Sequence, residues 1–143
     1  MRRVLVFGLG LGLGVNGAFM LLASETWYGL VPGVEHSGPF NGHFVRDVGA
    51  TYLIVATSFA WLAWDARARA AALAGTGFLV LHGLIHLAEA LAGGHVGHLA
   101  RDLPGVFLPA AAALFLAWPR HGTLSNRRDP HANLVRQTLD RPF

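Results

Sequence analysis

Ionisable side chains recur at helical spacing in two apolar stretches of the chain. His43 and Asp47 are four residues apart, and His82, His86 and Glu89 follow at steps of four and three residues. Side chains three or four positions apart lie on the same face of a helix. Neutral imidazoles and carboxylates are ligands for zinc, iron, manganese and copper(II). The pattern therefore predicts a transition-metal site shared by two helices.

The depth of these groups follows from the helical rise of about 1.5 Å per residue. His43 and Gly93 are taken as the outer boundaries of the two helices. Asp47 and Glu89 then each lie roughly 6 Å inside, and His86 about 10 Å. Two carboxylates at matched depth repel each other unless a cation or a shared proton lies between them. We expect an outer layer of His43, Asp47, His86 and Glu89, and an inner layer of His82, Tyr52 and Asn16.

A bound metal ion is the leading prediction for what lies between the carboxylates. The motif is not that of a zincin, because Gly83 and not Glu follows His82. The sequence leaves open whether His95 and His98 join the site. Such a site suits an oxidoreductase or an accessory subunit of one. The expected ligands are His43, Asp47, His86 and Glu89, with His36 and His82 as further ligands or contacts to one.

Three other functions fit the same side chains. An acid–base enzyme without metal would act on a lipid-like substrate, because buried histidines and carboxylates are suited to proton transfer. A structural subunit of a larger membrane complex needs only a hydrogen-bonded network of these groups. A b-type haem protein would take axial ligands from His43 or His36 and from His82 or His86.

Asp102 and Glu25 flank the expected spans, and both side chains are expected to be exposed to solvent.

The cysteine count excludes several classes of site. The chain has no Cys, so it has no disulfide, thiolate metal site, iron–sulfur cluster or covalently attached haem. It has only two Met, including Met1, which disfavours a dedicated Cu(I) carrier. No basic stripe interleaved with aromatic residues is present, so nucleic acid is not an expected partner.

The composition indicates a membrane protein. Of the 143 residues, 53% are hydrophobic and 13% charged, whereas soluble domains carry about 25% charged residues. About 20 apolar residues span a bilayer as a helix, so we expect an all-α bundle of four membrane helices. The expected spans are residues 4–23, 44–64, 70–92 and 103–118. Residues 1–118 would form one transmembrane domain with an outer loop at 24–42, and residues 119–143 a polar cytoplasmic tail.

The arginines set the expected orientation. All 11 basic residues are Arg, and nine of them precede the first span, join the second to the third, or follow the fourth. Only Arg46 and Arg101 fall on the other side. Because positive residues are retained in the cytoplasm, we expect both termini to be cytoplasmic and the polar site to face outward.

The outer loop and the start of the second span carry a motif. It comprises Trp27-Tyr28, Pro32-Gly33-Val34, Gly38-Pro39-Phe40-Asn41, His43-Phe44 and Arg46-Asp47. The motif resembles that of small bacterial four-helix membrane proteins of unknown function, over about residues 27–50. The resemblance implies a bacterial inner-membrane protein whose site faces the periplasm, and it transfers no catalytic role. The expected partners are the lipid bilayer and either a larger membrane complex or further copies of the chain.

The first expected span carries glycines at alternate positions, namely Gly8, Gly10, Gly12 and Gly14. Small residues four positions apart let two membrane helices approach closely. We therefore expect a neighbouring helix to pack tightly against this span.

Overall fold

All the regular secondary structure is helical in the part of the chain that the computed structural model describes, residues 1–93 and 97–119. The long helices are α1 (Arg2–Leu22), α3 (Gly42–Trp64) and α4 (Arg69–Ala92). α2 (Ser24–Leu30) and η1 (Val34–Ser37) connect α1 to α3, and η2 (Ala66–Ala68) connects α3 to α4. The last segment joins α5 (Gly97–Asp102), the π-helical turn η3 (Leu103–Phe107) and α6 (Leu108–Ala117). The all-α prediction is confirmed for these residues, and the predicted tail beyond residue 119 lies outside them.

Local chemistry explains where α3 begins and how the last segment continues. The Asn41 side chain accepts hydrogen bonds from the backbone N–H groups of His43 and Phe44, both at 3.1 Å, and so caps the first turn. Pro109 has no N–H to donate to the preceding turn, and the Leu108 N–H bonds to the Leu103 carbonyl. This wider turn keeps α5 and α6 in one unbroken helical segment.

Three helical segments are long and apolar enough to cross a membrane. They are Arg2–Leu22, Ala66–Ala92 and Leu99–Ala117, with mean hydropathies of 2.0, 1.6 and 1.5. α3 has a suitable length of 23 residues but is not among them, and its first turns carry the strongly hydrophilic side chains of His43, Arg46 and Asp47. The structure therefore supports a helical membrane protein, and the fourth span remains a prediction.

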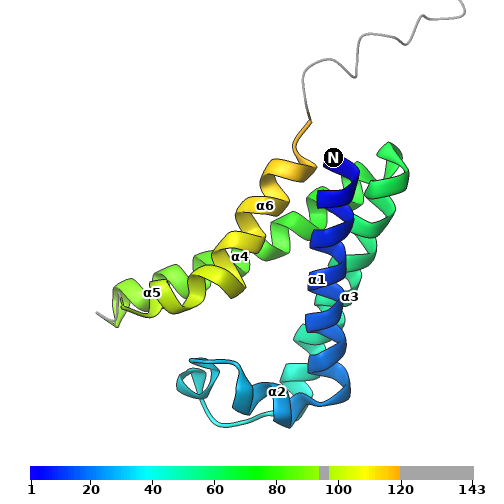
Figure 1. Cartoon of the computed structure of the whole chain (residues 1–143). Coiled ribbons are helices and arrows are strands. Elements are labelled where there is room, and N and C mark those ends of the chain that lie inside the picture. Colours follow the sequence, from blue (N-terminus) through cyan, green and yellow to red (C-terminus); the bar gives the residue numbers. More distant parts are fainter. Residues whose placement is uncertain (94–96, 120–143) are drawn as a thin grey trace, which may run out of the picture.

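α1 and α3 lie side by side along their length (Figure 1). A Cβ atom on Gly17 would lie 2.7 Å from the carbonyl oxygen of Gly49, and one on Gly10 would lie 3.0 Å from a carbonyl oxygen of α3. Gly8 and Gly12 would meet no atom within 4 Å. The expected close approach is confirmed, and only part of the glycine series takes part in it.

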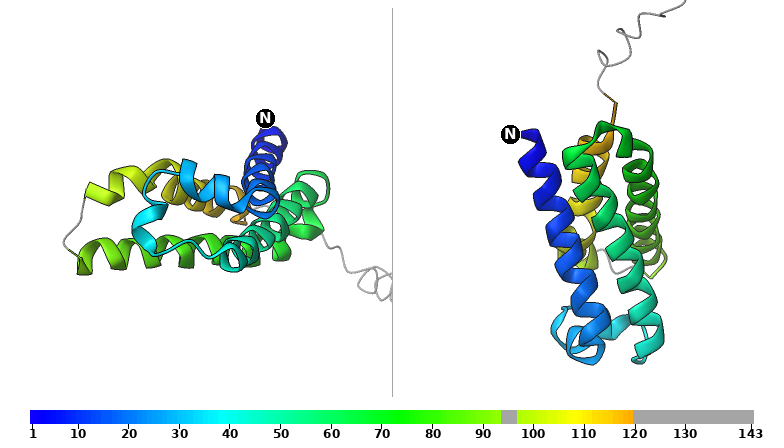
Figure 2. Two further views of the ribbon diagram at one scale, coloured as in Figure 1. Left: turned by 90° about the horizontal axis from the view of Figure 1, so that it is seen from below. Right: turned by 90° about the vertical axis from the view of Figure 1, so that its right-hand side faces the viewer.

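The pair formed by α4 and α6 leans away from the pair formed by α1 and α3, so the helices form a V (Figure 1). The pairs converge at the end that carries the N-terminus, where Val6, Phe59 and Ala113 are at most 2% exposed. They diverge toward α2 and α5, and the segment from α2 to η1 lies at this open end (Figure 2). A Cβ atom on Gly33 would lie 2.8 Å from Cδ of Arg101. The loop therefore touches α5 as well as the α1–α3 pair.

Gly17→Ala is expected to destabilise the fold by about 1–3 kcal/mol, because the added methyl group overlaps the backbone of α3. Gly12→Ala lies on the same helix but adds its methyl group in open space, so stability should stay within about 0.5 kcal/mol of the parent. Thermal unfolding of both variants in detergent, followed by circular dichroism, measures the difference. Equal melting temperatures would contradict the close approach of α1 and α3.

Candidate functional site

An ionisable pair joins α4 to α5 at the open end of the V. His86 Nδ1 lies 2.9 Å from Asp102 Oδ2, and the side chains are 30% and 18% exposed. α4 runs antiparallel to the α5–α6 segment, which brings the last turns of α4 beside α5 (Figure 1). An ionised carboxylate only accepts hydrogen bonds, so Nδ1 of His86 is the donor. This bond orients the imidazole and leaves its Nε2 free to exchange a proton or bind a metal.

Aromatic contacts continue from His86 toward the centre of the fold. The ring centroids of His82 and His86 are 4.7 Å apart, with 73° between the ring planes. The His82 ring stacks on Phe78 at 5.9 Å and meets the Tyr52 ring edge-on at 6.3 Å. Tyr52 is only 5% exposed. We call the row Asp102, His86, His82 and Tyr52 the polar file.

A cavity of about 370 Å³ lies within the V, between α1, α2, α3 and the η3–α6 segment. We call it the wedge cavity. Its lining is mostly apolar, with Asn16, Trp27 and Tyr52 as its polar side chains. Trp27 Nε1 donates a hydrogen bond of 3.0 Å to Asn16 Oδ1, which ties α2 to α1 at the cavity wall. Because Tyr52 also contacts His82, the polar file reaches the wedge cavity through Tyr52.

The predicted outer layer is divided between separate places. His43 Nε2 lies 3.3 Å from Asp47 Oδ2 on one face of α3, and these side chains are 88% and 63% exposed. His86 is paired with Asp102 and not with Asp47. Glu89 is exposed near the end of α4. Among the described residues, the carboxylates of Asp47 and Glu89 therefore have no common partner.

The predicted inner layer is partly assembled. His82 and Tyr52 are in ring contact, whereas the Asn16 side chain bonds to Trp27 and donates to the sulfur of Met20 at 3.7 Å. Three further predicted or undecided histidine side chains lie outside the described part of the chain, namely those of His36, His95 and His98.

Among residues 1–93 and 97–119, no three His, Asp or Glu side chains converge as a group that would hold a metal ion. The predicted ligands form two close pairs there, His82 with His86 and His43 with Asp47. The metal and haem hypotheses, with their full ligand sets, therefore stay predictions.

The expectation of a solvated flank is wrong for Asp102, because its carboxylate is 18% exposed and bonded to His86. The last helical segment begins at Gly97, before the expected start at residue 103, so Asp102 lies within the helix. The sequence carries one signal that could have identified Asp102. Its carboxylate directly precedes an apolar span, and that span has to pack beside the helix with His82 and His86. The other expected flank, Glu25, is exposed.

No protein-family model, curated protein or solved structure matches this chain. The likeness of its outer loop to small bacterial membrane proteins therefore stays a prediction. Function has to be inferred from the polar file and the wedge cavity themselves.

Asp102→Asn is expected to lower the free energy of unfolding by about 1–2 kcal/mol, because it weakens a largely buried hydrogen bond to a charged acceptor. Asp47→Asn breaks the corresponding contact with His43 on an exposed helix face, where such pairs contribute about 0–1 kcal/mol. Unfolding of the two variants in the same detergent compares the pairs. A loss for Asp47→Asn as large as that for Asp102→Asn would show that the His86 pair has no special structural role.

Proposed function

We propose that the protein crosses the bacterial inner membrane four times, with both termini in the cytoplasm. Three segments have the length and hydropathy of membrane spans. α3 lies along α1, so a bilayer crossed by α1 also surrounds α3. Nine of the 11 Arg residues lie in the first turn of α1, between α3 and the first residue of α4, or after α6, and the positive-inside rule assigns that side to the cytoplasm. The polar file then lies toward the periplasmic side.

We propose that the polar file is an acid–base site that exchanges a proton with a lipophilic molecule in the wedge cavity. The observation that carries this proposal is the hydrogen bond between Asp102 and His86. A carboxylate bonded to Nδ1 orients an imidazole and stabilises its protonated form, which is how histidine serves as a general acid and base. Ionisable side chains within a membrane helix are functional-site candidates, because inserting them is costly.

Each member of the polar file has its own role in this proposal. Asp102 accepts the hydrogen bond from Nδ1 of His86 and so orients its imidazole ring. His82, one helical turn deeper on α4, passes the proton between His86 and the cavity side. Tyr52 lines the wedge cavity, where its phenol group donates a hydrogen bond to an oxygen atom of the ligand.

The wedge cavity supports a ligand that is mostly apolar and carries one acidic or hydrogen-bonding group. Its volume of about 370 Å³ falls in the range of about 300–1,000 Å³ that small-molecule sites occupy. Gly8 and Gly12 leave room along α1, and Gly105 does so on the opposite side. A lipid-like phenol or carbonyl compound has the matching chemistry.

A chromogenic acid tests the acid–base proposal without the natural ligand. A nitrophenol with an alkyl chain, whose phenolate absorbs visible light, is titrated into the detergent-solubilised protein at constant pH. We expect the protein to raise the phenolate fraction above that in empty micelles, because the proton passes by way of His82 to His86. His82→Phe and His86→Phe should bind the probe with similar affinity but lose most of this increase.

The glycines provide the controls for this experiment. Gly12→Leu fills the wedge cavity and should weaken probe binding at least about tenfold, or 1.4 kcal/mol. Gly77→Leu also adds a side chain in open space, but Gly77 does not line the cavity, so binding should stay unchanged. An unaltered phenolate fraction in both histidine variants, or equal binding by both glycine variants, would contradict the proposal.

A transition-metal site is the second candidate, because the same geometry suits it. Carboxylates bonded to Nδ1 orient metal-binding histidines and raise their basicity. Asp102 holds His86 in this way, and the His82 ring lies beside it on the same face of α4. Water or a bound ligand would complete the coordination.

Elemental analysis and an optical spectrum of the protein, purified without chelator, test the metal candidate. If it holds, His82→Phe and His86→Phe should lose a stoichiometric metal, and Asp102→Asn should lower the metal affinity by about 10–100-fold. His43→Phe is the control, since His43 lies apart on α3; metal loss in this variant would support the wider ligand set predicted from the sequence. A Soret band would indicate haem instead. Protein that carries no metal and binds no added Zn²⁺ would eliminate this candidate.

A further inference from the structure

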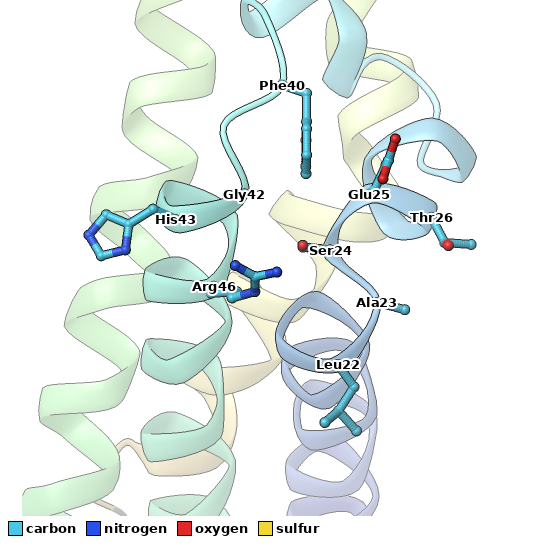
Figure 3. Close-up of a pocket in the computed structure, with 9 residues that line it drawn as sticks. All are labelled: Leu22, Ala23, Ser24, Glu25, Thr26, Phe40, Gly42, His43 and Arg46. Atoms are coloured by element: carbon cyan, nitrogen blue, oxygen red, sulfur yellow. The ribbon is translucent and has the colours of Figure 1, made fainter.

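A second pocket lies where α1 turns into α2, beside the first turns of α3 (Figure 3). We call it the corner pocket. It measures about 650 Å³, and its lining includes Leu22, Ser24, Glu25, Phe40 and Arg46. None of the polar file takes part in it, so it is independent of the acid–base site.

Arg46 supplies the positive charge of the corner pocket. Its guanidinium extends from α3 toward the corner between α1 and α2, whereas the His43 ring points to the other side of α3 (Figure 3). His43 is already paired with Asp47. Arg46 makes no hydrogen bond or ion pair with the residues that the structure describes. The guanidinium is therefore available to a ligand.

Ser24 adds a hydroxyl group to the lining of the corner pocket. The residue is 4% exposed, and its oxygen faces the side of the pocket on which Arg46 lies (Figure 3). It forms no hydrogen bond with any residue of the described ranges. The lining of the corner pocket thus presents a hydroxyl group and a guanidinium, neither of which has a partner among the described residues. Both groups donate hydrogen bonds, and an oxygen-rich anion accepts them well.

The surroundings of the corner pocket indicate where this anion comes from. α1 is a candidate membrane span that ends at Leu22, and Leu22 is 87% exposed. The pocket thus lies at the end of a span, where lipid headgroups meet the protein. The Phe40 ring covers the pocket from the loop side, and the Glu25 carboxylate points away from Arg46 (Figure 3). The pocket lining thus carries a positive group, Arg46, and a negative group, Glu25, that is separate from it.

We propose that the corner pocket binds the headgroup of an aminophospholipid. The phosphate diester accepts hydrogen bonds from the Arg46 guanidinium and the Ser24 hydroxyl, a pairing to which arginine is well suited. The ammonium group of the headgroup pairs with the Glu25 carboxylate. The acyl chains run along the apolar surface at the end of α1, beside Leu22.

Native mass spectrometry of the whole protein tests this assignment. The protein is equilibrated with vesicles of phosphatidylethanolamine and phosphatidylglycerol in equal amounts, and the retained lipid is identified. We expect preferential retention of phosphatidylethanolamine. Arg46→Gln should lower the retention of both lipids at least about tenfold, whereas Glu25→Gln should keep the lipid but lose the preference. Ser24→Ala should lower the retention of both lipids without changing the preference.

Arg67→Gln is the matched control, since it removes one exposed positive charge at the opposite end of α3 and should bind lipid like the parent. Arg46→Lys should recover part of the retention, and the melting temperature of Arg46→Gln should equal that of the parent. Full retention by Arg46→Gln would overturn the site. Preference of the parent for phosphatidylglycerol would overturn the aminophospholipid assignment. Displacement of the lipid by millimolar inorganic phosphate would show a site for free phosphate instead.

Discussion

The glycine contact between α1 and α3 is the constraint on which the rest of the structure depends. Gly17 and Gly49 let the two backbones meet at a distance that any larger side chain would prevent. In a bilayer the lipid chains are as apolar as the side chains, so helices associate through such close van der Waals packing. The α4–α6 pair joins this rigid unit mainly at the converging end, where the core is best buried. The open V is the result.

The same contact positions Tyr52. A Cβ atom on Gly17 would lie 3.0 Å from the Tyr52 Cβ atom, so Tyr52 stands where the two helices approach most closely. From there it lines the wedge cavity and contacts His82 on α4. Tyr52, at the inner end of the polar file, belongs to α3, whereas Asp102, at its outer end, belongs to α5 on the other side of the V. The spacing of α1 and α3 is thereby linked to the geometry of the proposed acid–base site.

The open end of the V gathers the proposed chemistry, and α2 is its common wall. α2 contributes Ser24 to the corner pocket and Trp27 to the wedge cavity. The loop that follows α2 rests on Arg101, the neighbour of Asp102. A short helix and one loop therefore border the proposed lipid site, the ligand cavity and the outer end of the polar file.

The sequence by itself determined the helical, membrane-associated character of the chain, because composition and the length of apolar runs need no tertiary information. It also placed His82 and His86 on one helix face, since their spacing matches the helical repeat. It predicted a close helix contact at the glycines of residues 8–14, but not the contact of Gly17 with Gly49. Only the tertiary structure decided which groups meet. Periodicity sets the face of each helix but not which helices meet. The antiparallel packing of α4 beside α5 brings His86 to Asp102, whereas His43 and Asp47 contact each other on α3.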